Sequence, residues 1–423
     1  MELVRPLSDE DRAILDLECE TVAGHTCKVL ILEDAVSVEG LRESIASRVG
    51  RAPELRDRLT EINGVPAWSR DGDLEIGEHV VDDGGARLDD DALRQRVAEL
   101  FELRLDRSKP LWRLDVLRLE RGGSALVWRI HHALADGTTA MRIARGALWD
   151  EPEDDSVLRP HGRSPFGTAG HRTAEGLLVL AHETPHLHRS PFDGTIDARR
   201  SVAFAVGDLD ALKRVAADAC GATVNDAVLT VVGGGIRRWL EVHHCPTGPV
   251  RVKVPVSLHG ADAGHGDAAP EPGNRDSFFI VDLPLGPADP AERLAAIHRA
   301  TKARKEDHDA ARIDAMMHEL GSVSPRLRSF ADRVLTSPRS FALNVSNVPG
   351  PRRPIEVLGV PVEALYSIAE IRERHALRIA VLSLAGTLRF GLCADPTLLP
   401  DVDHLAAAIE EEAAELAAIP ATT

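Results

Sequence analysis

The chain of 423 residues is long enough for two or three domains of about 150 residues each. Apolar residues make up 43% and charged residues 28%, which is typical of a globular protein with a substantial core and excludes global disorder. The formal charge of -17, from 67 acidic and 50 basic residues, would repel a phosphate backbone, so nucleic acid is a poor candidate partner.

Cysteine usage and the amino terminus both favour a reduced, cytoplasmic location. The five cysteines are scattered and form no CxxC pair, so neither a disulfide framework nor a zinc site is indicated. The first residues, MELVRPLSDEDRAILDLE, are polar and acidic, unlike a secretory signal. No run of about 18 apolar residues occurs, so we expect no spanning helix, and any contact with a membrane or lipid droplet would be peripheral.

Strand-like and helix-like segments alternate along the chain, which predicts a mixed α/β (α+β) fold. Residues 26–33 are β-branched and apolar and predict a buried strand, and a helix is expected over 36–48. Strands at 113–120 and 124–130 flank the turn residues Arg121-Gly122-Gly123, which predicts a hairpin. A helix over 138–149 follows directly.

Regular periodicity nearly disappears from residue 151 to 194, where Pro, Gly, His and acidic residues gather. This segment predicts a linker between an N-terminal lobe, 1–150, and a C-terminal lobe, 195–423. The C-terminal lobe is expected to contain a strand at 202–206, helices at 208–217 and 224–240, and a strand at 340–345. Residues 260–274 hold four glycines and two prolines and predict a surface loop. Gly233-Gly234-Gly235 inside a helix indicates a close backbone contact or a bend.

The stretch SALVWRIHHALADG, residues 124–137, carries the most chemical information. Side chains alternate along a strand, so His132 shares a face with Trp128 and Ile130, whereas His131 faces the other way. A histidine that ends an apolar stripe is shielded from water, which lowers its pKa and keeps the ring neutral and able to accept a proton. An isolated histidine on an apolar face is more often a satisfied core residue, so the strand by itself leaves both interpretations open.

The spacing HHxxxDG, formed by His131, His132, Asp136 and Gly137, is similar to the signature of the CoA-dependent acyltransferases that include chloramphenicol acetyltransferase and peptide-synthetase condensation domains. Four further motifs stand in the expected order: PLW at 110–112, ND at 225–226, NVSNVPGP at 344–351 and SLAGTLRFGLCAD at 383–395. Together they resemble the bacterial wax ester synthase/diacylglycerol acyltransferase family over nearly the whole chain.

Two departures from that family concern a possible substrate pocket: ETVAGH at 20–25, and Leu384 where the family usually has the tyrosine of SYAG. The resemblance implies two chloramphenicol-acetyltransferase-like lobes, each a mixed sheet with flanking helices, and an active-site channel between them. It implies transfer of a fatty acyl group from acyl-CoA to a long-chain alcohol or diacylglycerol, giving wax ester or triacylglycerol. His132 would act as general base without a covalent acyl-enzyme, and no cofactor is expected because acyl-CoA is a co-substrate.

The other motif residues have structural interpretations as well. His131 is expected to support the loop, with a catalytic role as the alternative. Asp136 fits the N-cap of the helix that follows, and the resemblance implies that it pairs with an arginine to hold the histidine loop. Gly137 allows a tight turn.

Candidate residues beyond the histidine motif come mainly from the C-terminal lobe. TVND at 223–226 is a capping-box pattern, so Asp226 is expected to be structural, while Asn225 in the first helical turn could stabilise an oxyanion. The resemblance places Ser346 and Asn347 beside the channel as substrate-binding candidates. Trp112 is either core packing, which we favour, or a substrate contact.

Several alternatives stay open. Histidines at 182, 186, 188, 243 and 244 raise the possibility of metal, but Pro185 interrupts the first group, no HExxH pattern is present, and we expect no metal site. The basic amphipathic segment 324–339 could pack on the lobe or lie on an anionic lipid surface. A condensation-type acyltransferase that uses a carrier-protein thioester and a non-catalytic lipid-binding homologue are the alternative functions. The oligomeric state is not predicted.

Overall fold

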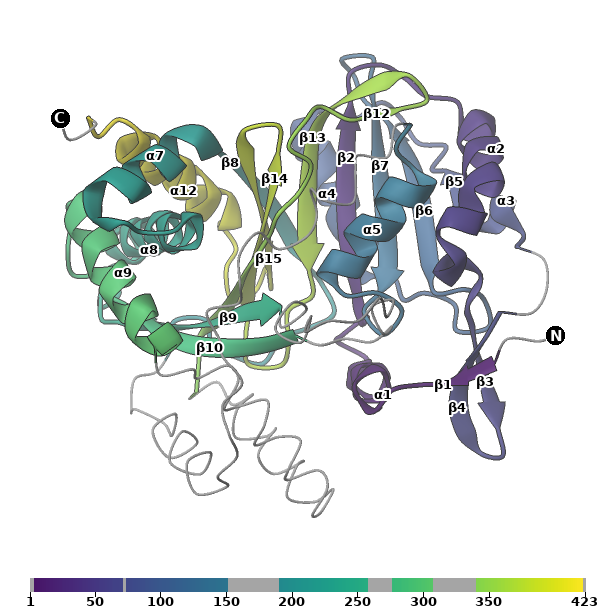
Figure 1. Ribbon diagram of the computed structural model, residues 1–423, viewed down its shortest axis with the longest axis horizontal. Coiled ribbons are helices and arrows are strands. Elements are labelled where there is room, and N and C mark those ends of the chain that lie inside the picture. The colour runs from purple at the N-terminus through teal and green to yellow at the C-terminus, as the bar shows by residue number, and fades with distance from the viewer. Residues whose placement is uncertain (1–3, 71–73, 151–189, 258–275, 307–339, 421–423) are drawn as a thin grey trace, which may run out of the picture.

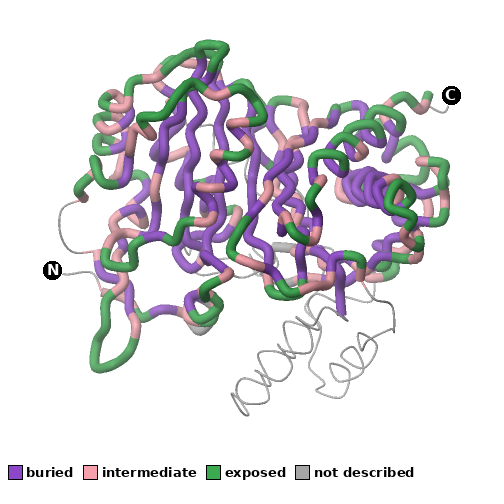
Figure 2. The backbone as a smooth tube through the Cα atoms, turned by 180° about the vertical axis from the view of Figure 1, so that it is seen from behind, coloured by how far each residue is buried: buried purple, intermediate pink, exposed green. Residues whose placement is uncertain are grey.

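The computed structural model describes residues 4–70, 74–150, 190–257, 276–306 and 340–420 of the chain. Two six-stranded sheets stand side by side with helices packed against them, which confirms the predicted α/β fold (Figure 1). A third, small sheet has the order β1-β4-β3, from β1 (Val4–Pro6), β3 (Arg58–Ile62) and β4 (Val65–Ser69). The interior strands of the large sheets are buried, whereas loops and outer helix faces are exposed (Figure 2).

The first large sheet contains the histidine motif. Its order is β12-β13-β2-β7-β6-β5. The strands are β12 (Glu356–Val357), β13 (Val360–Ala369), β2 (His25–Leu32), β7 (Ser124–His131), β6 (Trp112–Arg118) and β5 (Val80–Asp82). Strands β6 and β7 pair antiparallel around Gly122, whose φ of 100° suits glycine, so the predicted hairpin is confirmed. All eight residues of β2 and of β7 are buried, as expected of central strands.

Helices cover both faces of this sheet. α2 (Val38–Arg48) and α5 (Gly137–Ala147) pack in one cluster with Leu126, Trp128 and Ile130. α4 (Asp90–Glu102) packs in the other cluster with Ala125 and Val127. The alternation predicted along β7 is therefore confirmed. The remaining helices on this side are α1 (Asp9–Leu17), α3 (Ile76–His79) and the short 3-10 helices η1 (Val49–Arg51) and η2 (Pro53–Arg56).

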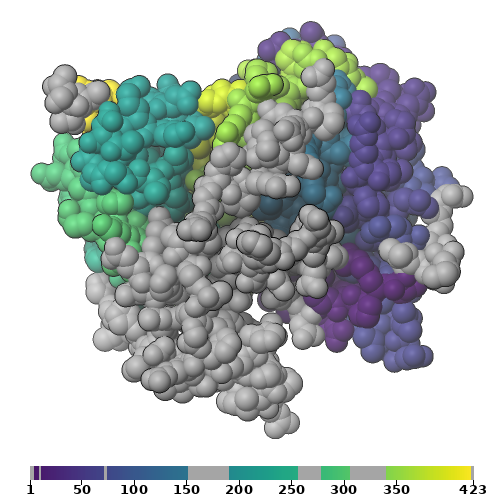
Figure 3. Space-filling model, in the orientation of Figure 1, coloured from purple at the N-terminus to yellow at the C-terminus, as the bar shows by residue number. Residues whose placement is uncertain are grey.

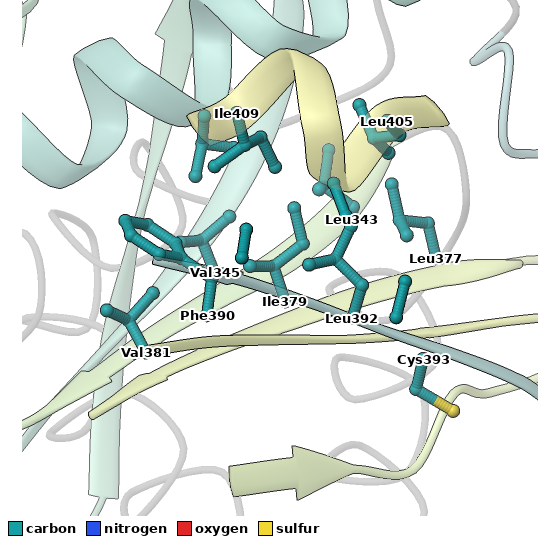
Figure 4. Packing of buried hydrophobic residues seen from close by; sticks show 14 of the residues in the cluster. Leu343, Val345, Leu377, Ile379, Val381, Phe390, Leu392, Cys393, Leu405 and Ile409 are labelled. Carbon is teal, nitrogen blue, oxygen red and sulfur yellow. The ribbon is translucent and has the colours of Figure 1, made fainter. Parts of the chain in front are cut away.

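The second large sheet has the order β10-β9-β11-β14-β15-β8. Its strands are β8 (Ser201–Asp208), β9 (Val250–Ser257), β10 (Asp276–Leu283), β11 (Leu343–Val348), β14 (Leu377–Leu384) and β15 (Thr387–Ala394). Its helices are α7 (Leu209–Cys220), α8 (Val224–Val242), α9 (Pro290–Glu306) and α12 (Val402–Ala417). Leu405 and Ile409 of α12 lie over the apolar side chains of β11, β14 and β15 (Figure 4).

The prediction for the strand before NVSNVPGP was wrong in its position. The expected strand covered residues 340–345 with a loop after it, whereas β11 runs from Leu343 to Val348. The reason is parallel pairing with β14, which continues from Asn344 opposite Arg378 to Val348 opposite Leu382. The ladder supplies hydrogen bonds that the turn-forming residue types alone did not reveal.

Two of the three consecutive glycines of α8, Gly234 and Gly235, make the close contact that the sequence indicated. A Cβ on Gly234 would lie 2.2 Å from Glu412 Oε2, and one on Gly235 would lie 2.5 Å from Ile409 Cγ1. Both neighbours belong to α12. The glycines therefore let α8 and α12 approach more closely than side chains would allow.

The two large sheets do not divide at the predicted linker. Strands β12 and β13 lie within the segment 195–423 assigned to the C-terminal lobe, yet β13 pairs with β2 of the first sheet. Figure 3 shows this crossing as yellow-green atoms beside the purple surface of the N-terminal part. At the junction, a Cβ on Gly391 of β15 would lie 2.1 Å from the Ser367 backbone oxygen of β13, so only glycine permits this approach. The linker boundaries stay predictions, because residues 151–189 lie outside the described segments.

No single helix in the described segments is long and apolar enough to cross a membrane. Helices α7 and α8 pass that test only when they are taken together, and they are bent by 101°.

Candidate active site

The two adjacent histidines occupy different environments. His131 ends β7, is 1% exposed and lies opposite His25 of β2. Its Nδ1 accepts a hydrogen bond from the Ala133 backbone N–H at 3.1 Å, so a neutral ring carries its proton on Nε2. That Nε2 faces Glu18 Oε2 at 3.5 Å. Because both ring nitrogens contact protein groups inside a closed environment, the geometry supports the structural interpretation of His131.

Glu18 is itself held in place by charge. Arg107 donates two hydrogen bonds to its Oε2, of 2.6 and 2.9 Å. Burial alone would raise the pKa of Glu18, but His131 and Arg107 together lower it below the ordinary value. The carboxylate therefore stays ionised and fixes the His131 ring.

His132 is half-buried and lies one residue beyond the end of β7. Its backbone N–H donates to the Gly24 carbonyl at 3.0 Å, which prolongs the contact between this segment and the chain that enters β2. Burial lowers the pKa of His132 to about 4, the positive charge of Arg378 adds to the lowering, and Asp136 opposes it. The ring is therefore neutral at physiological pH and suited to accept a proton.

Asp136 caps α5, as predicted. Its Oδ1 accepts a hydrogen bond of 2.6 Å from the Thr139 backbone N–H, and the residue is 3% exposed. In the described part of the chain, no arginine forms an ion pair with Asp136, so the arginine partner implied by the resemblance is not found there. The negative charge of Asp136 instead raises the pKa values of His132 and Lys28, against the lowering by burial.

Lys28 is a buried cation that the sequence analysis did not single out. It lies in β2 opposite Trp128, on the same face as His132, and its Nζ donates to Ser367 Oγ at 2.6 Å. Burial lowers the pKa of Lys28 to about 8, and the nearby Asp136 opposes the lowering. A single lysine in the otherwise apolar strand TCKVLIL was the signal that could have revealed it.

Gly137 and the NVSNVPGP motif meet at the start of α5. A Cβ on Gly137 would lie 3.3 Å from Val348 Cγ2, so the end of β11 packs against the histidine loop. Ser346 and Asn347 precede Val348 in β11 and are half-buried. This arrangement supports a position beside the motif, and their contact with substrate stays a prediction.

The NVPGP and SLAG motifs also contact one another. The Gly350 backbone N–H donates to Ser383 Oγ at 2.9 Å, and the Ala385 N–H donates to the Pro351 carbonyl at 2.9 Å. Leu384, which replaces the usual tyrosine, is 4% exposed and packs in the same apolar cluster as Trp128. The departure therefore contributes to the core.

The remaining candidates lie farther from the histidines. Trp112 stacks on His79 and donates from Nε1 to the Leu55 carbonyl at 2.8 Å, which supports core packing; contact with substrate stays a prediction. Asp226 forms the predicted capping box of α8 and also accepts from Thr301 at 2.6 Å, which supports its structural interpretation. Asn225 is half-buried in the first turn of α8, and its oxyanion role stays a prediction.

The histidines considered as metal ligands fall partly outside the described residues. His182, His186 and His188 lie outside the described residues. His243 stacks on Trp239 and contacts Asp401 Oδ2 at 3.0 Å. Within the described ranges, no group of three or more histidine, cysteine or acidic residues is arranged to hold a metal ion.

Comparison with known protein families identifies two matching domains. The wax ester synthase/diacylglycerol acyltransferase catalytic domain matches residues 7–186, and the C-terminal domain of the same family matches residues 272–417. Together the two domains account for most of the chain.

Individual relatives agree with the domain matches. A provisionally named diacylglycerol O-acyltransferase of Mycobacterium bovis is 30% identical over 83% of this chain and 83% of its own length. An O-acyltransferase of Acinetobacter baylyi is 26% identical over 73% of each chain. Among solved structures, a wax ester synthase/diacylglycerol acyltransferase from Marinobacter aquaeolei superposes with a TM-score of 0.71 at 23% identity, covering 97% of this chain and 98% of its own. The first condensation domain of the calcium-dependent antibiotic synthetase gives a TM-score of 0.64 at 17% identity, covering 100% and 98%.

Proposed function

Since the chain belongs to the wax ester synthase/diacylglycerol acyltransferase family, we propose that it moves a fatty acyl group from acyl-CoA to a lipid hydroxyl with His132 as general base. The acceptor is a long-chain alcohol or a diacylglycerol, and the product is a wax ester or a triacylglycerol. The assignment of the base is carried by the half-buried position of His132 one residue beyond β7, where burial lowers the pKa of the imidazole and keeps it neutral. His131, by contrast, is closed in by Glu18 and the main chain.

The reaction follows from this one base. His132 accepts the proton of the acceptor hydroxyl as its oxygen attacks the thioester carbonyl carbon, and the new C–O bond forms. When the tetrahedral intermediate collapses, the C–S bond breaks and the histidine returns the proton to the departing thiolate of CoA. Atoms and charge balance without a cofactor or a covalent acyl-enzyme.

Thiol release provides the test. The purified chain is incubated with palmitoyl-CoA and either hexadecanol or a diacylglycerol, while free CoA is followed with a colorimetric thiol reagent and the ester by mass spectrometry. We expect CoA and ester to appear in equal amounts and only when an alcohol is present. Turnover with an acyl carrier protein but not with acyl-CoA would instead favour the condensation-type alternative, and no turnover with either donor would favour a lipid-binding protein.

We further propose that the protein meets a lipid surface peripherally, because its acceptors are poorly soluble in water. An exposed apolar tip supports this: Ile62 and Val65 flank the β3–β4 turn and are 44% and 42% exposed. The basic amphipathic segment 324–339, for which a lipid contact was one of two interpretations, lies outside the described residues. Flotation with lipid vesicles tests the proposal by comparing the wild type with a double variant, Ile62→Ser and Val65→Ser. Equal recovery of the two proteins with the vesicles would contradict a role for the tip.

A further inference from the structure

The turn that leads into β2 touches both histidines. The Gly24 carbonyl accepts the hydrogen bond of 3.0 Å from the His132 backbone N–H. Gly24 has a φ of 76°, and a Cβ there would lie 2.7 Å from His131 Nε2. Both its conformation and its contact with the ring therefore require glycine. The position of this turn sets the position of the His132 main chain.

A carboxylate from the far end of the chain holds the same turn. Glu370 follows the last residue of β13, and its Oε2 accepts a hydrogen bond of 3.1 Å from the Ala23 backbone N–H. Its other oxygen, Oε1, accepts from Arg200 Nε at 2.8 Å. Glu370 and Arg200 are 7% and 6% exposed. Each oxygen of the carboxylate thus has a partner in a buried environment.

Arg200 also binds the turn directly. It lies just before β8 of the second sheet, and its Nη2 donates to the Thr21 carbonyl. Its backbone N–H donates to Glu102 Oε1 at the end of α4, at 2.7 Å. Burial raises the pKa of the Glu370 carboxyl, and the Arg200 guanidinium and the Ala23 N–H oppose that rise. Breaking such a pair leaves an uncompensated buried charge.

We propose that Glu370 is a positioning residue for the reaction: together with Arg200 it fixes the Thr21–Gly24 turn, and the turn fixes the main chain of His132. The inference rests on the proposed function, in which His132 is the base. Because Arg200 precedes the second sheet and Glu370 follows β13, the base reaches its working position only when the two sheets are docked. Glu370 itself need not touch either substrate.

Glu370→Gln tests the proposal, because an amide cannot accept from Ala23 and Arg200 with equal strength. We expect kcat to fall about ten- to a hundredfold, as small displacements of a catalytic group do, with the KM for palmitoyl-CoA unchanged within about twofold. Glu370→Asp, which keeps both acceptors on a shorter side chain, is expected to recover part of kcat. Hydrogen exchange at the backbone of residues 130–134 is expected to quicken in Glu370→Gln, because the bond from His132 N to Gly24 O loosens.

Glu412→Gln provides the matched control. Glu412 is another buried glutamate with arginine partners, Arg293 and Arg238, but it belongs to α12 and packs against α8, beside the second sheet. The Glu412→Gln substitution is expected to lower the unfolding midpoint and to leave kcat unchanged. Should Glu370→Gln fail to fold, Arg200→Lys gives the same test, since a lysine cannot bind Glu370 and Thr21 through separate nitrogens of a fork.

A native kcat in folded Glu370→Gln, or an equal fall of kcat in Glu412→Gln, would overturn the positioning role while leaving the proposed function intact. His132→Ala, assayed beside them, separates the two proposals. Its loss of turnover supports the base, whereas a native rate in His132→Ala would remove both the base and the inference that rests on it.

Discussion

Two regions of the molecule bury ionisable groups, and they do so for different ends. Under α8, Arg293 and Glu412 are 0% and 1% exposed and form an ion pair, and Arg238 Nε donates to the second Glu412 oxygen at 2.7 Å. Around His132, burial and Arg378 lower the pKa of the imidazole to about 4. The first region neutralises charge by pairing, whereas the second prevents charge from forming on the imidazole of a half-buried residue.

The comparison shows that burial of an ionisable residue does not by itself identify a catalytic group. A closed pair such as Arg293 of α9 and Glu412 of α12 links these two helices but offers no group that exchanges a proton with a substrate. A neutral, half-buried histidine can exchange one with a substrate. Substitutions in the two regions should therefore separate effects on stability from effects on chemistry.

The largest effect is expected from His132→Ala. Loss of a general base typically lowers turnover by about 10²- to 10⁴-fold, while the unfolding midpoint should change less than in His131→Ala, because His132 is only half-buried and lies beyond the end of β7. Thiol release and thermal unfolding measure the two quantities. His131→Ala is the neighbouring control, and it should lose stability, because it removes the contacts with Glu18 and Ala133, while it keeps far more turnover. Equal losses of turnover in the two variants would contradict the division of roles.

Gly234→Ala should have the opposite effect, with a loss of stability and no loss of turnover. The added methyl would lie 2.2 Å from Glu412 Oε2, so we expect a loss of about 1–3 kcal/mol in unfolding free energy, as for other overpacked sites, and an unchanged kcat. Denaturant titration measures it. Gly233→Ala in the same helix is the control, because its nearest neighbours would be 3.7 Å away. It should be neutral or slightly stabilising, and a large loss there would contradict the packing argument.

The pH dependence of kcat/KM provides a third test. Because the folded pKa of His132 is about 4, below its ordinary value of 6.5, the base form persists well below neutrality. The acid limb of the profile should therefore inflect about pH 4, with activity complete above it and lost as the pH falls through it. Circular dichroism over the same range monitors folding. An inflection near 6.5 in folded protein would mean that the working histidine is solvated.

Asp136→Asn should have the smallest effect. Asparagine keeps an oxygen for the Thr139 N–H, so the cap of α5 survives. The negative charge that raises the pKa of His132 is removed, and the acid limb should move to lower pH. Asp136→Ala removes the cap as well and should cost about 1 kcal/mol of stability. If the limb moves to higher pH in Asp136→Asn, the charge of Asp136 does not act on His132 as inferred.

Much of this organisation could be predicted from the sequence where the pattern was local. Alternation along residues 124–132 separated His131 from His132, and the TVND pattern gave the capping box formed by Thr223 and Asp226. What could not be predicted depends on distant pairing. The predicted end of β11 was wrong because its pairing partner β14 lies more than thirty positions later in the sequence. The contact of Glu370 with Ala23 spans 347 residues and had no local signal. Lys28 stood out locally as a single lysine in an apolar strand, but its partner Ser367, 339 residues away, could not be predicted.

The crossing of β13 into the first sheet bears on how the chain is made. During synthesis, β2 emerges early, but its neighbour on one side is not available until residues 360–369 have left the ribosome. Until then one edge of β2 presents unpaired N–H and C=O groups, which favours association with other chains. A product that stops short of residue 360 is therefore expected to depend on chaperones, and the tendency of the nascent chain to aggregate should fall once residues 360–369 can pair with β2.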